Sequence, residues 1–231
     1  MKIAPPISPI AVDQCMFGLG GVGHWAYDIA GRSNVASVAE IREVKLEVIN
    51  DDVYQLGSRT KRGDVWVDVG SHVGLFSIAA MMAGADVSTM YDMDGEMAWC
   101  AEYNAHQFVR QQLVRDYRQR VRPVAFAERV SGHEQLVEAG MLTKTIWDKI
   151  ATRSCLKLDI QGGEADVLGG IGATALTEAF DFMVLEWHDI PTAPAFLAHL
   201  EDSGWRIDGY AGGHTDVLLD TETCIVWASN G

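Results

Sequence analysis

The sequence lacks several features that would place it in a broad class at once. No apolar run approaches the roughly 20 residues that a membrane-spanning helix needs, so no membrane association is expected. The first residues, Met1–Pro6, are interrupted by prolines and lack the long apolar region of a secretory signal, which favours a cytoplasmic protein. Basic residues are also few, with 18 Lys and Arg against 32 Asp and Glu. The resulting net charge of −14 argues against a nucleic-acid partner, which usually needs a basic surface.

Cysteine is scarce as well. The four cysteines, Cys15, Cys100, Cys155 and Cys224, are scattered and form no pair with the spacing of metal ligands. Reduced thiols are therefore expected, as in a cytoplasmic protein. What is present is a chain of 231 residues with a 48% hydrophobic fraction, enough for a substantial core. These values fit one large α/β domain, or one domain with an extension.

The strongest pattern runs from Val65 to Gly84 and indicates a buried strand, a glycine turn and a helix. Gly70 and Gly74 would let the backbone turn sharply and approach a ligand closely. Asp68 lies at the carboxyl end of the strand, where open α/β sheets bind ligands. The free amides at the start of the helix favour an anionic group. A phosphate loop is excluded, because the Gly-Lys-Ser/Thr sequence is missing.

A second strand is predicted over residues 85–91, and Asp92 stands at its end. In a nucleotide-binding βαβ unit, an acidic residue about 20 positions after the glycine turn holds the ribose diol. A carboxylate suits this task because it accepts hydrogen bonds from both hydroxyls. The alternative is a solvated acid that caps the next helix, and the strand–turn–helix context favours the ribose reading.

The middle of the chain continues the same alternation. A helix is predicted from Gly95 to about Phe108, with Asn104 bonded to a buried group. A third strand follows over residues 122–127, then a helix over 132–139 that ends at Gly140. Glu128 follows the third strand, and its position alone suggests that it borders the adenine of a nucleotide.

Two further strands end in titratable residues. A strand ends at Asp159, and after a glycine turn a helix begins near Glu164 and carries Val167, Leu168 and Ile171 inward. Residues 182–188 form another apolar strand, with Glu186 and His188 at its carboxyl end. A helix over 193–203 and two strands over 205–210 and 224–228 complete the prediction. The total is seven strands in one sheet.

The N-terminal part is harder to interpret. Val44, Leu46 and Val48 alternate with charged residues, which predicts a β-hairpin over residues 40–60. Residues 18–23 form a Gly-x-Gly-x-x-Gly sequence, but no convincing strand precedes it, so a flexible surface segment is favoured over a dinucleotide loop. We divide the chain into residues 1–62, an N-terminal extension with a hairpin, and residues 63–231, a nucleotide-binding domain.

The motifs, taken together, resemble those of the FkbM-type methyltransferases, which depend on S-adenosylmethionine. The resemblance covers about residues 63–190 and is specific, because several motifs agree in order and approximate spacing. The segments that carry it are Val67–Gly74, Asn104, Thr145–Asp148, Leu156–Glu164 and Leu185–His188. It implies a class I methyltransferase (Rossmann-like) α/β fold with a seven-stranded, mostly parallel sheet and helices on both faces. It also implies methylation of an oxygen, often a hydroxyl of a sugar or a secondary metabolite, so a small molecule or a glycan is the expected partner.

The motif residues that are expected around the cofactor are Asp68, Gly70, Ser71, His72, Gly74, Asp92, Met93 and Glu128. The sequence departs from the family pattern in three places. Met93 stands where proline commonly follows the ribose-binding acid, His72 replaces a frequent asparagine, and Gln161 replaces a usual glutamate. The last change matters most, because an amide cannot act as a base or bind a metal as a carboxylate does.

A hydroxyl acceptor must lose its proton, and a nearby base can take it. His188 is the first candidate, because its ordinary pKa of about 6.5 is near working pH. Asp159, Glu164 and Glu186 are the other candidates at the same edge, although each could have a structural role instead. No bound metal is expected. Two alternatives stay open: an NAD-dependent oxidoreductase that uses Gly18, Gly20 and Gly23, and a non-catalytic binding protein on a methyltransferase fold.

Overall fold

Seven strands form one sheet in the computed structural model, which describes residues 9–11, 25–27, 44, 46–113, 124–147, 153–216 and 221–230. The strands of this sheet are β3 (Val65–Val69), β4 (Asp86–Asp92), β5 (Val124–Ala127), β6 (Ser154–Leu158), β7 (Phe182–Trp187), β8 (Trp205–Asp216) and β9 (Thr221–Asn230). Their order is β5-β4-β3-β6-β7-β9-β8, and β9 runs antiparallel to both of its neighbours. The seven-stranded, mostly parallel sheet predicted from the sequence is confirmed. A separate antiparallel pair joins β1 (Pro9–Ala11) to β2 (Trp25–Tyr27).

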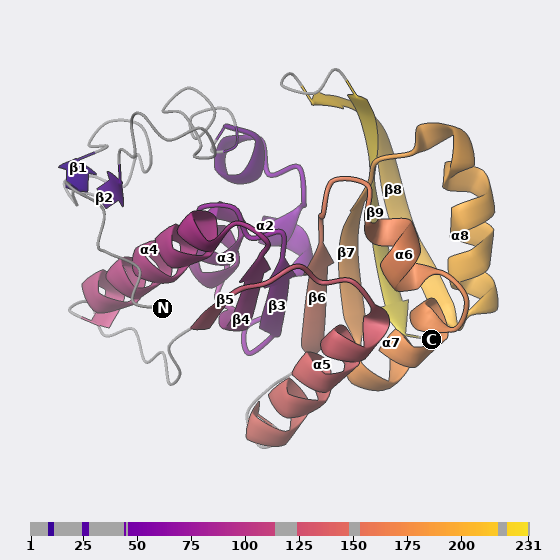
Figure 1. Cartoon of the computed structure of the whole chain (residues 1–231), viewed down its shortest axis with the longest axis horizontal. Helices are drawn as coiled ribbons and strands as arrows, with labels where there is room; N and C mark the ends of the chain where they lie inside the picture. The colour runs from indigo at the N-terminus through magenta and orange to yellow at the C-terminus, as the bar shows by residue number, and fades with distance from the viewer. Residues whose placement is uncertain are drawn as a thin grey trace.

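Helices cover both faces of the sheet (Figure 1). They are η1 (Leu46–Asn50), α2 (Leu56–Arg59), α3 (Leu75–Met82), α4 (Gly95–Leu113), α5 (His133–Trp147), α6 (Glu164–Leu168), α7 (Gly172–Ala179), η2 (Ile190–Thr192) and α8 (Ala193–Asp202). One core lies between the sheet and η1, α3 and α4; the other lies between the sheet and α5, α6, α7 and α8. Within the described ranges, no helix combines the length and the apolar character needed to cross a membrane.

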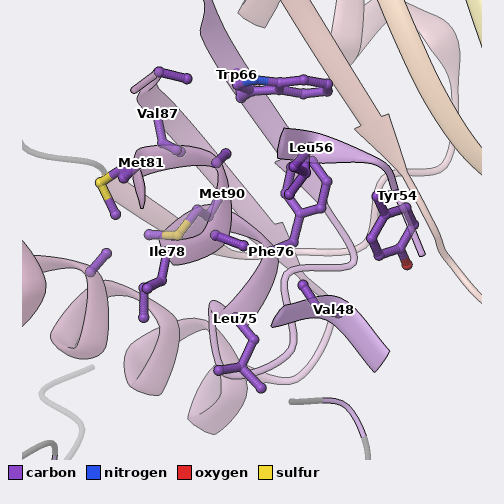
Figure 2. Close-up of a cluster of buried hydrophobic side chains, with 14 of the residues drawn as sticks. Val48, Tyr54, Leu56, Trp66, Leu75, Phe76, Ile78, Met81, Val87 and Met90 are labelled. Carbon is purple, nitrogen blue, oxygen red and sulfur yellow. The ribbon is translucent and has the colours of Figure 1, made fainter. Parts of the chain in front are cut away.

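Alternating side chains of each central strand enter the two cores. Trp66 belongs to the first core and Val67 to the second, as expected for a strand whose successive side chains point to opposite faces. Figure 2 shows the first core, where Trp66 lies among side chains from α3 and β4. The ring of Trp66 packs edge-on against Phe76, with 5.2 Å between the ring centroids. Both faces of the strands are buried, which explains their nearly continuous apolar sequences.

The order of the strands creates a crossover at the centre of the sheet. From β3 the chain moves outward through β4 to β5, then returns to place β6 on the other side of β3. The carboxyl ends of β3 and β6 therefore flank the point at which the winding direction reverses. Ligands of open α/β sheets bind at this point.

The predicted hairpin over residues 40–60 is wrong for the part that the structure describes. Residues 46–50 form the π-helical turn η1, and the amide of Asp51 donates to the carbonyl of Leu46 at 2.8 Å. Val48 is buried in the first core, and Val44, four residues earlier, packs against it. The apolar residues of this short segment fit an i, i+4 face as well as an alternating strand, which made its periodicity ambiguous.

Two smaller predictions also need correction. The helix predicted to end at Gly140 continues to Trp147. A Cβ atom on Gly140 would lie 2.7 Å from the Cβ of Ala179, so the glycine allows α5 to pack closely on α7 and does not end the helix. Ile171, predicted to face inward, lies beyond the end of α6 and is 73% exposed.

Candidate functional site

The turn between β3 and α3 is held in an unusual backbone conformation. Gly70, His72 and Gly74 have positive φ angles of 76°, 49° and 84°. A Cβ on Gly70 would lie 1.5 Å from the carbonyl oxygen of Asp159, and one on Gly74 would lie 3.0 Å from the Cα of Ala101. Both glycines were predicted to let the backbone turn sharply and approach a ligand. The positive φ angles show the sharp turn, and the missing side chains also leave room for the loop after β6 and for helix α4.

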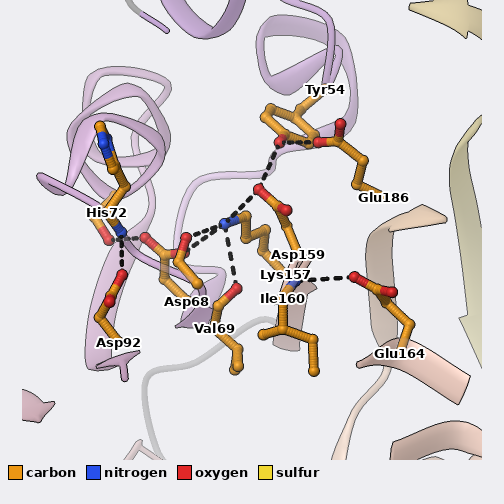
Figure 3. Close-up of polar contacts among 12 residues, drawn as sticks. Tyr54, Asp68, Val69, His72, Asp92, Lys157, Asp159, Ile160, Glu164 and Glu186 are labelled. Atoms are coloured by element: carbon orange, nitrogen blue, oxygen red, sulfur yellow. Dashed lines mark hydrogen bonds and ion pairs between the residues drawn. The ribbon is translucent and has the colours of Figure 1, made fainter. Parts of the chain in front are cut away.

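Asp92 lies at the carboxyl end of β4, beside this turn (Figure 3). Its Oδ2 accepts a hydrogen bond from the amide of His72 at 2.8 Å, and its Oδ1 accepts one from the amide of Asp94 at 2.9 Å. Burial raises the pKa of Asp92, although these two hydrogen bonds oppose the change. Each carboxylate oxygen can accept a second hydrogen bond, so Asp92 can still receive ribose hydroxyls.

Asp68 is fully buried beneath the turn. Its Oδ2 accepts a hydrogen bond from the Ser77 hydroxyl at 2.6 Å, and its Oδ1 lies 3.4 Å from the Lys157 ammonium. Asp68 therefore has a structural role, because its carboxylate links β3 to α3 through Ser77 and to β6 through Lys157.

Three other residues predicted around the cofactor differ in exposure. Ser71 is buried, and its Oγ has no hydrogen-bond partner among the described residues. Met93 is 74% exposed and Glu128 is exposed as well. Asp92 pairs with Ala127 in the register of β4 and β5, so Met93 and Glu128 each follow a paired residue at the same edge of the sheet.

Lys157 is a member of the site that the sequence analysis did not single out. It lies near the carboxyl end of β6 with a side chain only 3% exposed. Its ammonium donates to the carbonyls of Val69 at 3.2 Å and Gly70 at 2.6 Å, and it lies 3.3 Å from Asp159 Oδ2. Burial by itself lowers the pKa of a lysine, but the carboxylates of Asp159 and Asp68 outweigh burial and raise it. A charged residue inside an apolar strand was the signal in the sequence.

The four predicted catalytic side chains come together at the carboxyl ends of β6 and β7. Nδ1 of His188 lies 2.9 Å from Glu164 Oε1, while its Nε2 faces Asp159 Oδ1 at 3.7 Å and Glu186 Oε1 at 3.9 Å. Glu164 Oε1 also accepts hydrogen bonds from the amides of Ile160 and Gly162, at 3.0 and 3.3 Å. Glu164 thus links the loop after β6 to the imidazole. We call Asp159, Glu164, Glu186 and His188 the carboxylate–histidine cluster.

Tyr54 closes one side of this cluster, and nothing in the sequence pointed to it. Its hydroxyl donates to Glu186 Oε2 at 2.8 Å and lies 3.4 Å from Asp159 Oδ2 (Figure 3). Burial and the carboxylates of Glu186 and Asp159 raise the pKa of Tyr54 well above its usual value. Its hydroxyl therefore remains a hydrogen-bond donor at any ordinary pH.

The cluster shifts the pKa values of its own members. Burial and the neighbouring carboxylate of Asp159 raise the pKa of Glu186 to about 7. Burial alone would lower the pKa of His188, but the hydrogen bond with Glu164 and the nearby carboxylates outweigh it and raise the pKa to about 9. Without another cation in the cluster, the imidazole is protonated near neutral pH.

The cluster also has the spacing of a metal site. Asp159, Glu164 and His188 each offer one ligand atom, and these atoms lie within 4.8 Å of one another. Gln161, which stands where FkbM-type methyltransferases usually have a glutamate, is exposed and has a φ of 56°. The glycine-rich sequence at residues 18–23, on which the oxidoreductase alternative rests, lies outside the described residues.

Comparisons with known proteins place this site on a known fold. No protein-family model and no curated protein matches the chain. Among solved structures, magnesium protoporphyrin IX methyltransferase from Synechocystis, with S-adenosylmethionine bound, is 17% identical with a TM-score of 0.51, over 87% of this chain and 86% of that one. A protein of Pyrococcus horikoshii assigned as an RNA methyltransferase is 15% identical with a TM-score of 0.50, over 83% of this chain and 84% of that one. The chain has the class I methyltransferase fold, as its sequence predicted.

Proposed function

We propose that the chain is an S-adenosylmethionine-dependent methyltransferase that methylates a hydroxyl oxygen of a sugar or another small metabolite. The observation that carries the proposal is the placement of two sets of groups around the crossover of a methyltransferase fold. Asp92 and the turn after β3 lie on one side, and the carboxylate–histidine cluster lies on the other. The resemblance to FkbM-type enzymes supports the choice of a hydroxyl acceptor.

The residues present fit this cofactor. Asp92 keeps acceptor positions for the ribose hydroxyls, and the unpartnered Oγ of Ser71 is free to bond a polar group in the turn. Met93 offers an exposed apolar side chain beside Asp92, and it would cover the adenine together with the side chain of Glu128. The cofactor, when bound, supplies an electrophilic methyl group, and the protein supplies binding and orientation.

The cluster supplies what the acceptor requires. The carboxylates of Asp159 and Glu186 can accept a hydrogen bond from a hydroxyl and so orient its oxygen, which accounts for much of the rate in a two-substrate reaction. Asp159 Oδ1 and His188 Nε2 have no hydrogen-bond partner among the described residues, so Asp159 Oδ1 can accept a substrate proton directly, and Nε2 can accept one once the imidazole has lost its own. The net charge of −14 favours a small acceptor over a nucleic acid.

Binding calorimetry with S-adenosylmethionine is the first test. We expect Asp92→Ala to weaken binding by about 1–3 kcal/mol, because hydrogen bonds to a charged group are lost. Asp166→Ala is the matched control, since Asp166 is an exposed acid on α6 and should leave the affinity unchanged.

A methyl-transfer screen over glycan and metabolite hydroxyls then identifies the acceptor. Transfer to a hydroxyl supports the proposal. Unchanged affinity in a folded Asp92→Ala protein would reject the cofactor site. Cofactor binding with no turnover on any acceptor would favour a non-catalytic binding protein, and methylation of RNA alone would overturn the acceptor class.

A further inference from the structure

Two buried polar atoms in the carboxylate–histidine cluster face each other without a hydrogen bond. Asp159 Oδ1 and His188 Nε2 have no partner among the described residues, and they lie 3.7 Å apart. The side chain of His188 is only 8% exposed. Leaving a buried polar atom unpaired is unfavourable, so two such atoms at one point indicate a ligand that binds between them.

The other side of the imidazole is already fixed. Nδ1 of His188 lies 2.9 Å from Glu164 Oε1, and that oxygen is itself held by the amides of Ile160 and Gly162. A carboxylate that accepts from Nδ1–H keeps that proton in place, so an ion that binds the imidazole displaces the proton on Nε2. In this arrangement Nε2 is available as a ligand and points toward Asp159 and Glu186.

The distances suit a single ion. Nε2 of His188 lies 3.7 Å from Asp159 Oδ1 and 3.9 Å from Glu186 Oε1. Transition metals bind nitrogen and oxygen ligands at about 2.0–2.2 Å, so two ligands of one ion lie at most about 4.3 Å apart. The separation of Nε2 and Asp159 Oδ1 falls within this limit, and the ligand atoms of Asp159, Glu164 and His188 all lie within 4.8 Å of one another.

The charges favour a cation as well. Three carboxylates, those of Asp159, Glu164 and Glu186, surround one imidazole. The Lys157 ammonium approaches Asp159 from the side of Oδ2 and is shared with Asp68, so it offsets the excess only in part. A divalent cation between the two unpartnered atoms would offset the remaining negative charge.

We propose that the cluster binds one divalent transition-metal ion at Asp159, Glu164 and His188, with Glu164 also orienting the imidazole. One imidazole and two carboxylates suit ions such as Zn²⁺ and Mn²⁺. The expectation of a metal-free site came from Gln161, but that side chain is exposed, and the carboxylates close enough to His188 to share an ion with it are Asp159 and Glu164. Binding of the ion is independent of the proposed function. A role of the ion in holding the acceptor oxygen rests on that function.

The test is titration of the metal-stripped full chain with Zn²⁺ by calorimetry and with Mn²⁺ by electron paramagnetic resonance. We expect one ion per chain. Asp159→Asn and His188→Gln should each remove the site, and Glu164→Gln should weaken it about 10–100-fold, as loss of a ligand-orienting partner does. His133→Gln is the matched control, because His133 also lies 3.7 Å from a carboxylate, that of Glu134, and should bind as wild type does.

Thermal melting of each variant shows whether it is folded, and His188→Gln carries the test if Asp159→Asn does not fold. Stoichiometric binding that is lost in the cluster variants and kept in His133→Gln supports the site. No saturable binding by the wild type, or equal binding by His188→Gln, overturns it. Ion binding without methyl transfer would leave the metal site standing and reject the proposed function. Methyl transfer by a protein that binds no ion would support the proposed function and overturn the metal site.

Discussion

The positive charge of Lys157 stabilises buried negative groups around it. Its ammonium lies within 3.4 Å of four oxygen atoms, and Asp68, one of its partners, is fully buried. A neutral side chain at position 157 would leave the Asp68 carboxylate in the core without its positive partner. Removing one member of a buried ion pair typically costs about 3–5 kcal/mol.

We therefore expect Lys157→Met to lower the free energy of unfolding by about 3–5 kcal/mol in urea denaturation. Lys144→Met is the matched control. Lys144 also lies near an aspartate, Asp181 at 3.6 Å, but both side chains are more than one third exposed, and such pairs contribute about 0–1 kcal/mol. Equal losses of unfolding free energy in the two variants would show that the buried pair stabilises the fold no more than the exposed pair does.

His188 gives a second prediction at the scale of one residue. Once an acceptor is known, His188→Ala should lower turnover on the order of 10²–10⁴-fold, the usual range for a lost acid–base group. The affinity for S-adenosylmethionine should stay nearly unchanged, since His188 belongs to the acceptor side. Turnover and cofactor affinity that fell together would place His188 at the cofactor instead.

The sequence predicted this side of the site in part. The four cluster residues stand at the ends of two apolar strands, and parallel strands of one sheet end at the same edge. Tyr54 could not be predicted, because it reaches Glu186 from a segment 132 residues away that has no regular pattern of its own. Lys157 was visible as a charge in an apolar strand, but its partners come from the turn after β3, which only the fold reveals.

At the scale of elements, the central strands were predictable and the segment before them was not. Residues 65–69 and 154–158 are buried on both faces, so their sequences are mostly apolar, apart from Asp68, Ser154 and Lys157, and they predict central strands. Among residues 46–49 only the side chain of Val48 is buried, and the structure of this segment depends on packing against α3. Such tertiary contacts override weak local preferences.

The close packing of α5 on α7 leads to a prediction for Gly140. A Cβ at this position would lie 2.7 Å from the Cβ of Ala179 and 2.8 Å from the ring of Phe180. Phe180 is fully buried and cannot turn away, so Gly140→Ala should force the two helices apart. We expect a loss of about 1–3 kcal/mol in the free energy of unfolding, measured in urea.

Gly95→Ala is the matched variant for this test. Gly95 begins α4, and a Cβ there would meet the Cβ of Ala127 at an ordinary distance of 3.4 Å. The added methyl group should leave stability unchanged or raise it by about 0.4–1 kcal/mol, through a less flexible unfolded chain. A neutral Gly140→Ala variant would contradict the packing described between α5 and α7.

At the scale of the whole molecule, each of the two cores contains at least one buried thiol, whose labelling can follow the unfolding of that core. Cys100 and Cys155 lie in the first core and Cys224 in the second, and all three are free. Burial raises the pKa of each thiol, that of Cys100 to about 12, so little reactive thiolate forms at neutral pH.

We expect these three cysteines to resist iodoacetamide in the folded protein and to become labelled together as urea unfolds it. Peptide mass spectrometry measures each site separately. Equal midpoints would show that the two cores open as one cooperative unit, as expected of a sheet that they share. Labelling of Cys224 well before Cys155 would show that the second core opens alone.

The contact between Gly70 and the carbonyl of Asp159 has a consequence for how such a chain can recombine with its relatives. The turn after β3 and the loop after β6 are separated by almost 90 residues in the sequence. Their backbones nevertheless pack so closely that position 70 has no room for a side chain. A chimera with a crossover between them would join a turn and a loop that had diverged separately, and any bulkier residue at position 70 would collide with the backbone opposite. We expect viable chimeras to inherit both segments from the same parent.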